Sequence, residues 1–132
     1  MIRVMLDTNV VSQLVKRNEI VRSHMRTKDV HACISVVTEG ELLYGLARHP
    51  AARQLNALVS QMLQRLDVLA WTRETAQRYG TLRAELERNG KTLAPLDLMI
   101  AAHALEADAF LATSDRAFAN VPGLKVADWS AP

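Results

Sequence analysis

The sequence predicts an α/β fold in which helices flank both faces of a parallel central sheet of about four to five strands. Short apolar segments alternate with helical segments along the chain, as in proteins built from strand–helix–strand units. The first apolar segment, Val4 to Leu6, shows no polar alternation and suits a strand buried on both faces. The 132 residues, 49% of them hydrophobic, fit one domain over 1–132.

The overall charge is nearly balanced, because 16 Lys and Arg residues against 14 Asp and Glu residues leave a net charge of +2. A local cationic patch can still bind phosphates. Asp7 interrupts the N-terminal apolar stretch, so we expect no signal peptide, and no later run reaches the ~20 apolar residues of a membrane span. Cys33 is the only cysteine, so neither a disulfide nor a thiolate metal site is expected. We therefore expect a cytoplasmic protein without a membrane segment.

The stretch from Arg3 to Asn9 is an apolar run that ends on the carboxylate of Asp7. Thr8 and Asn9 are favourable N-cap residues for a helix from Val10 to Val15. Asp7 then lies at the carboxyl end of an inner strand, where open α/β sheets bind their ligands. A lone acid at this point is equally compatible with a turn or capping role, so this stretch alone leaves both interpretations open.

Basic residues surround this helix and a second helical segment predicted over Ile20–Met25. The nearby acids are Glu19 and Asp29, against five cations: Lys16, Arg17, Arg22, Arg26 and Lys28. Such residues form either an ordinary solvated surface or a rim that attracts phosphates.

The second strand is predicted over Ala32–Val37, where apolar and β-branched residues dominate. Thr38 precedes Glu41 by three residues, which is the spacing of a capping box at a helix N-terminus. Glu41 therefore has a sufficient structural role in the helix that continues to Leu46, and a catalytic role is the alternative.

The clearest amphipathic helix spans Ala51–Leu66 and is followed by a third strand over Asp67–Trp71. Thr72 can cap the next helix. The apolar faces of Leu55–Leu66 and Tyr79–Leu86 exceed what one small sheet needs for cover, which predicts a homodimer.

Pro95 marks the start of a helix that continues to Leu105 and carries Asp97 in its first turn. This helix is apolar almost all round and is therefore expected to be buried. Within it, His103 is interpreted as a core or edge histidine, with metal ligation as the alternative.

The C-terminal part of the chain contributes the last two predicted strands. Phe110–Thr113 is the fourth strand, and Ser114-Asp115-Arg116 leads from it into a helical turn through Phe118. Lys125–Ala127 is predicted to form an edge strand.

Four acids fall where the strand-to-helix turns of one sheet edge should meet: Asp7, Glu41, Asp97 and Asp115. Because the carboxyl ends of parallel strands share one edge, we expect these carboxylates to gather there. Like charges raise one another's pKa and oppose folding, which predicts a bound cation. All-oxygen ligands favour Mg²⁺ or Mn²⁺. The chain offers no set of cysteines and no ligand-spaced histidine pair that would argue for zinc. A carboxylate-bound metal that activates water is suited to phosphodiester hydrolysis.

At this point the chain resembles PIN-domain proteins, and among them the VapC toxins of bacterial toxin–antitoxin pairs. The resemblance covers essentially the whole chain in order, on Leu6-Asp7-Thr8-Asn9, Glu41-Leu42-Leu43-Tyr44-Gly45, Pro95-Leu96-Asp97, Ile100-Ala101-Ala102-His103-Ala104, Thr113-Ser114-Asp115-Arg116, Val121-Pro122-Gly123-Leu124 and Asp128-Trp129. It implies a PIN-like fold and a metal-dependent endoribonuclease that leaves 5′-phosphate and 3′-hydroxyl ends. It also implies inhibition by a cognate VapB-type antitoxin and frequent homodimerisation. Enteric VapC relatives cut the anticodon loop of initiator tRNA, which suggests tRNA as the RNA substrate.

The resemblance also assigns roles to individual residues. The positions of Asp7, Glu41 and Asp97 match the three principal metal-site acids of the family. Asp115 matches the fourth, a position where relatives vary. Polar positions that would orient ligands or water are matched by Thr8, Asn9 and Thr113.

Three other functions compete with a nuclease. A haloacid-dehalogenase-like phosphatase also uses a strand-end Asp, but its mechanism needs a second Asp two residues later, where this chain has Asn9. A receiver domain is disfavoured because no acidic pair follows the first strand. A module that binds RNA or a partner without cutting is the remaining alternative, against which the complete set of four acids argues.

Overall fold

The computed structural model describes residues 1–132 and contains a five-stranded sheet in the order β3-β2-β1-β4-β5, with every neighbouring pair parallel. The strands are β1 (Ile2–Leu6), β2 (Val30–Ser35), β3 (Asp67–Leu69), β4 (Phe110–Ala112) and β5 (Val126–Ala127). The prediction of a parallel sheet in an α/β fold is confirmed, including its short edge strand.

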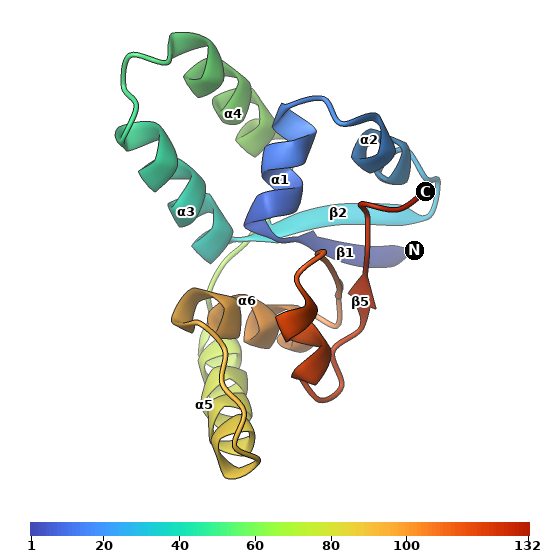
Figure 1. Ribbon diagram of the computed structural model, residues 1–132, viewed down its shortest axis with the longest axis vertical. Helices are drawn as coiled ribbons and strands as arrows, with labels where there is room; N and C mark the ends of the chain where they lie inside the picture. The colour runs from blue at the N-terminus through green and yellow to red at the C-terminus, as the bar shows by residue number, and fades with distance from the viewer.

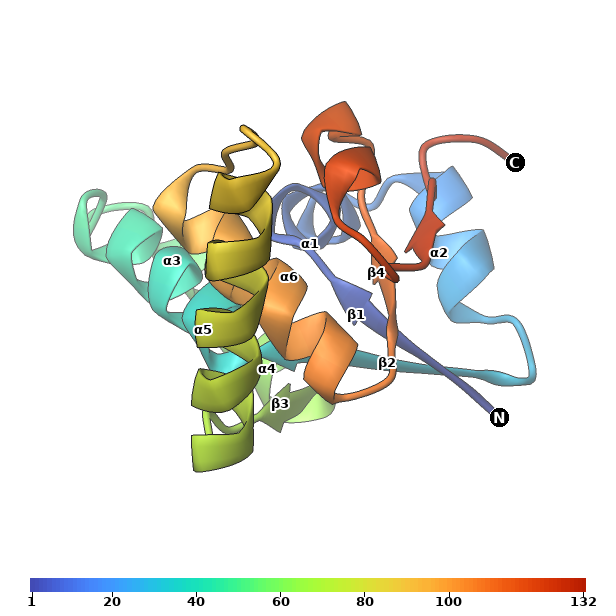
Figure 2. The ribbon, with the colours of Figure 1, turned by 90° about the horizontal axis from the view of Figure 1, so that it is seen from below.

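Helices cover both faces of this sheet, as Figures 1 and 2 show. On one side of the strands lie α1 (Thr8–Val15), α2 (Glu19–Met25), α3 (Val36–Ala47) and α4 (Arg53–Arg65). On the other side lie α5 (Arg73–Arg88), α6 (Pro95–Glu106) and the short 3-10 helix η1 (Arg116–Asn120). None of the helices combines the length and the apolar character that crossing a lipid bilayer requires.

Strand β1 forms the centre of the core because its side chains alternate between two buried clusters. Met5 belongs to the cluster formed with α5 and α6, whereas Val4 and Leu6 belong to the cluster formed with α1 to α4. All three side chains are buried. The prediction of a first strand buried on both faces is therefore confirmed.

The helix starts differ from the predicted ones at two places. Asp7 itself is the N-cap of α1, so the helix begins at Thr8, and neither Thr8 nor Asn9 is the cap. Helix α3 is capped by Ser35, whose side chain accepts the N–H of Val37. The capping-box interpretation of Thr38 and Glu41 was wrong, because α3 begins at Val36 and both residues lie inside the helix.

Thr38 has an unusual environment as a result. Its hydroxyl is buried and has no hydrogen-bond partner, whereas the equally buried hydroxyl of Thr75 donates to Glu106 at 2.5 Å. An unsatisfied buried polar group costs about 1–3 kcal/mol.

We therefore expect Thr38→Val, which keeps the shape and removes the hydroxyl, to raise the free energy of unfolding by about 1 kcal/mol. Thr75→Val is the matched control and should lower it by about 1–3 kcal/mol, because it leaves Glu106 without its donor. Urea unfolding of the three proteins at one protein concentration measures both changes. If the free energy of unfolding fell by the same amount in both variants, the hydroxyl of Thr38 would not be unsatisfied.

The two apolar faces that suggested a dimer are largely used inside the monomer. Val59 of α4 and Leu82 and Leu86 of α5 are buried in the core clusters. The large exposed apolar side chains of the helices near the sheet edge are Leu43 and Tyr44 of α3 and Leu96 of α6. The core therefore uses part of these faces, whereas Leu55 of α4 remains 41% exposed, and the homodimer stays a prediction.

Candidate active site at the carboxyl edge of the sheet

The strand order places a topological switch between β1 and β4. From β1 the chain builds β2 and β3 on one side of the sheet, and β4 and β5 follow on the other side. Open α/β sheets bind ligands at such a switch, outside the carboxyl ends of the strands. Asp7 directly follows β1 and Thr113 directly follows β4, so these two side chains flank the switch.

Asp7 is held firmly on both of its carboxylate oxygens. Its Oδ1 accepts the N–H of Val10 at 2.9 Å, which caps α1, and its Oδ2 accepts the hydroxyl of Thr113 at 2.5 Å. The residue is only 5% exposed, and burial raises its pKa above the ordinary value. The hydrogen bonds from Thr113 and Val10 oppose this rise, and the negative charge of Asp115 adds to it. Asp7 thus caps α1 and lies at the switch point at the same time.

Glu41 lies in the second turn of α3 and is tied to the start of α1. The hydroxyl of Thr8 donates to its Oε1 at 2.7 Å, across 33 residues of sequence. The role predicted for Thr8, orientation of a site residue, fits this contact. Asn9, predicted as a further support, has an exposed side chain without a hydrogen bond, and its backbone N–H contributes instead by lowering the pKa of Asp7.

Asp115 and Asp97 complete the set from two other segments. Asp115 caps η1 by accepting the N–H of Ala117, and its own N–H donates to the Thr113 hydroxyl at 3.0 Å. Thr113 therefore connects Asp115 with Asp7. Asp97 lies in the first turn of α6, behind Pro95, and its carboxylate has no hydrogen-bond partner in the protein.

The four acids are close enough to repel one another. Burial raises the pKa of Asp97, and the negative charges of Asp115 and Glu41 raise it further. Asp7 adds a smaller effect in the same direction. The positive end of α6 favours an ionised carboxylate, but burial and the neighbouring acids outweigh it. None of the four forms an ion pair with Lys, Arg or His, since the ion pairs of the protein lie elsewhere.

This donor set suits a hard cation that brings water with it. Every side chain of the set offers oxygen, and no protein cation neutralises the charge, which is the environment that Mg²⁺ or Mn²⁺ occupies. No three Asp, Glu, His or Cys side chains are close enough in this structure to hold one ion together. An ion at this edge therefore requires side-chain rotation or bridging waters, and Mg²⁺ normally keeps several of its waters.

Ser35 is a residue of this region that the sequence did not single out. Its Oγ accepts the N–H of Val37 and lies 2.7 Å from Nδ1 of His103, so its hydrogen is available to the ring. His103 is buried and burial lowers its pKa, which keeps the ring neutral. The interpretation of His103 as a core histidine fits this position. The contact joins the start of α3, which carries Glu41, to α6, which carries Asp97.

Comparison with known proteins identifies the family to which this arrangement belongs. The family model of the PIN domain matches residues 4–124. The tRNA(fMet)-specific endonuclease VapC of Salmonella typhimurium is 35% identical over 131 residues, covering 98% of this chain and 99% of that protein. The tRNA(fMet)-specific endonuclease VapC of Shigella flexneri is 36% identical over 132 residues, covering 98% of this chain and 100% of that protein.

Solved structures show the same architecture. VapBC2 of Rickettsia felis, bound to a DNA fragment from its promoter, superposes with a TM-score of 0.90 at 28% identity, covering 97% of this chain and 99% of that chain. DNA-bound VapBC of Salmonella typhimurium gives a TM-score of 0.88 at 35% identity, covering 98% of this chain and 99% of that chain. The likeness in sequence and in fold extends over nearly the whole length of both partners in each comparison.

Proposed function

The chain belongs to the PIN-domain family as a VapC-type endoribonuclease, and we propose that the carboxylates at the switch point carry its activity together with Mg²⁺ or Mn²⁺. The observation that carries this proposal is the convergence of four acids from four segments without a protein cation to balance them. The proposed catalytic and metal-binding residues are Asp7, Glu41, Asp97 and Asp115, supported by Thr8, Asn9 and Thr113. We take residues 1–132 as a single PIN domain.

The ion, when bound, would supply a water of lowered pKa and neutralise charge on the phosphate. The residues of the chain orient the carboxylates that would hold the ion. Thr8 fixes Glu41, and Thr113 fixes Asp7, so these carboxylates present defined lone pairs toward the switch point. Asp97 has no other partner and is free to bind or to take the proton of the attacking water. Attack forms a new P–O bond and breaks the P–O3′ bond, which leaves a 5′-phosphate, and the 3′ oxygen departs as a hydroxyl after protonation.

A cleavage assay tests this function directly. Purified protein incubated with total bacterial RNA and Mg²⁺ should create new 5′-phosphate ends at defined positions, and EDTA in excess should abolish them. A phosphatase of the haloacid dehalogenase type would release phosphate without new RNA ends. A binding module would retain RNA without cutting it, so persistence of intact RNA in both Mg²⁺ and Mn²⁺ would refute the proposal.

The relatives guide the choice of substrate and partner. Two of them are described as tRNA(fMet)-specific endonucleases, and solved structures contain VapB bound to VapC. We therefore propose initiator tRNA as the substrate, a VapB-type antitoxin as the inhibitory partner, and the cytoplasm as the place of action. Expression of the chain alone should arrest bacterial growth, and co-expression of the antitoxin from the adjacent gene should relieve the arrest. Normal growth with abundant folded protein would contradict the toxin role.

We also propose a homodimer, through the exposed apolar residues of α3 and α6. Leu43, Tyr44 and Leu96 are 50%, 65% and 44% exposed, and the two helices contact each other. Such a concentration of exposed large apolar side chains marks an interaction surface.

Light scattering at micromolar concentration should give the mass of a dimer, and Tyr44→Glu should give that of a monomer. Ile20→Glu, which places the same charge on an exposed apolar position of α2, is the matched control and should remain dimeric. A monomeric wild type would contradict the proposal.

A further inference from the structure

A groove leads away from the active site between α1, α3 and α4. It has a volume of about 340 Å³ and is lined at one end by Thr8 and Glu41, the hydrogen-bonded pair of the active site. Farther along, its walls are largely apolar, with Val15, Leu46 and Leu55 among the lining residues. The volume lies at the lower end of the range of about 300–1,000 Å³ that is typical of pockets for small ligands.

The charges around this groove favour an anionic ligand. Lys16 lines it and forms no ion pair, and His49 lines it with a ring that makes no hydrogen bond in the protein. The chain has no Asp or Glu between Leu42 and Leu66, so Glu41 is the only acid of the groove. A phosphate close to Lys16 would therefore meet attraction without a competing carboxylate on α4.

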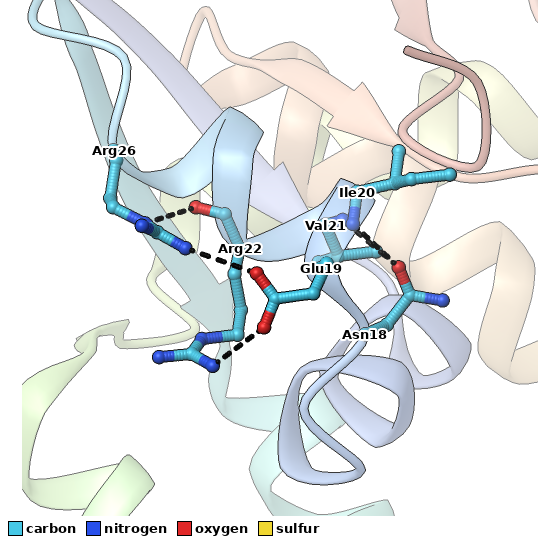
Figure 3. Close-up of polar contacts among 6 residues, drawn as sticks. All are labelled: Asn18, Glu19, Ile20, Val21, Arg22 and Arg26. Carbon is cyan, nitrogen blue, oxygen red and sulfur yellow. Dashed lines mark hydrogen bonds and ion pairs between the residues drawn. The ribbon is translucent and has the colours of Figure 1, made fainter.

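Two of the other cations in this region, Arg22 and Arg26, are already paired with Glu19. Figure 3 shows Glu19 between two arginines, with its oxygens 3.0 Å from Arg22 and 3.6 Å from Arg26. The sequence left open whether the basic residues of this region are ordinary surface or a phosphate-binding rim. Glu19 neutralises part of that set, and Lys16 is the member that lies unpaired in the groove beside the site.

Gly45 provides a second, independent indication. Glycine inside a helix costs roughly 0.5–1 kcal/mol relative to alanine, so its presence needs a reason. No atom lies within 4 Å of a Cβ built at any of the three helical glycines, Gly40, Gly45 and Gly80, so packing inside the monomer requires none of them, and Gly45 is the one of the three that lines the groove. Gly45 lines the groove, and glycine is the residue that lets a ligand approach the backbone closely.

We propose that this groove is a binding subsite for one unstacked nucleotide of the RNA substrate, next to the phosphodiester that is cut. The apolar wall and the open surface at Gly45 take the base, and Lys16 with the His49 ring takes the adjoining phosphate. Single-stranded RNA is recognised in this way, through bases splayed out of the stack and cations on the backbone. The inference rests on the proposed ribonuclease function and adds where the strand lies relative to Glu41.

Two glycine variants test the base site. In protein that carries Asp97→Asn so that the RNA stays intact, Gly45→Leu should weaken binding of a short fluorescein-labelled single-stranded RNA by about tenfold, as expected for one lost base contact. Gly80→Leu in α5 is the matched control, because its Cβ also meets no atom within 4 Å and it does not line the groove. Both changes replace a helical glycine, so both should raise the melting temperature, and only the first should lose RNA affinity.

A charge pair tests the phosphate site. Lys16→Ala should reduce the slope of log affinity against log salt concentration by about 1, whereas Lys28→Ala, at the opposite edge of the sheet, should leave it unchanged. Unchanged RNA affinity in Gly45→Leu overturns the subsite. If Gly45→Leu binds RNA normally but is no longer inhibited by the antitoxin, the groove belongs to a protein partner, and the subsite is overturned as well. Degradation of the probe by Asp97→Asn protein would instead refute the proposed catalytic site.

Discussion

Without metal, Asp97→Asn should melt at or above the temperature of the wild type, while its RNA cleavage in Mg²⁺ falls by more than about 100-fold. Loss of a residue that only supports a metal ligand costs about 10–100-fold, and Asp97 is proposed to touch the ion or its water. Asparagine has nearly the same shape, and the packing of α6 should therefore persist. Mutual repulsion among the acids disappears in the variant, which should stabilise the metal-free protein by an amount on the order of 1 kcal/mol or less, given solvent screening.

The pH dependence follows from the direction of the pKa shift. The pKa of Asp97 in the folded protein lies above its ordinary value of 3.8, because of burial first and neighbouring acids second. The folded protein therefore binds this proton more tightly than the unfolded chain, and ionisation of Asp97 lowers stability as the pH rises through the folded-state pKa. The advantage of Asn in EDTA should be full at neutral pH and should vanish as the pH falls toward 3.8.

Adding Mg²⁺ should reverse the order of stability. An ion that binds only the folded state stabilises it by mass action, and the variant that has lost a ligand gains less. Thermal melts in EDTA and in Mg²⁺, with one cleavage assay, measure all three effects. Glu39→Gln is the control, because Glu39 precedes Glu41 by two residues in α3 and is not in the proposed set. An Asp97 with a purely structural role would instead give a variant that is destabilised with and without metal and cuts RNA in proportion to its folded fraction.

The sequence predicted that the four acids lie near one another, whereas it misplaced the helix starts around Asp7 and Glu41. Asp7 was recognisable because a run of apolar residues stops at it, and the strand order then places it at the switch point. A capping role for Asp7 was one of the interpretations left open, and Thr8 and Asn9 were named as the caps, because all three are favourable N-cap residues and composition does not say which one caps the helix. At α3 the same ambiguity favoured Thr38 over Ser35, since Ser35 stands inside a strand-like run.

Sequence patterns did not predict the contacts between segments that are distant in the chain. The bond from Thr113 to Asp7 joins residues 106 positions apart, and the bond from Ser35 to His103 joins residues 68 apart. Periodicity reports which face of an element is apolar, but it does not report which partner covers that face. For that reason the apolar faces of α4 and α5 suggested a dimer although the monomer buries much of them.

Two substitutions of Asp7 should distinguish its effect on RNA cleavage from its effect on stability. Asp7→Asn and Asp7→Ala should both lose more than about 100-fold in RNA cleavage, because each removes the charge at the switch point. Only Asp7→Ala should be strongly destabilised, by about 1–3 kcal/mol, since alanine cannot accept the N–H of Val10 or the hydroxyl of Thr113. Asn keeps an acceptor for the cap.

Burial gives the metal-free Asn variant a further advantage. The pKa of Asp7 is raised mainly by burial, so the ionised carboxylate destabilises the fold above its folded-state pKa, and this penalty is relieved as the pH falls through that value toward 3.8. In EDTA at neutral pH, Asp7→Asn should therefore unfold at a urea concentration equal to or above that of the wild type, with Asp7→Ala well below both. If both variants unfolded early by the same amount, the charge of Asp7 would be stabilising the metal-free fold, and a role as an uncompensated site acid would be excluded.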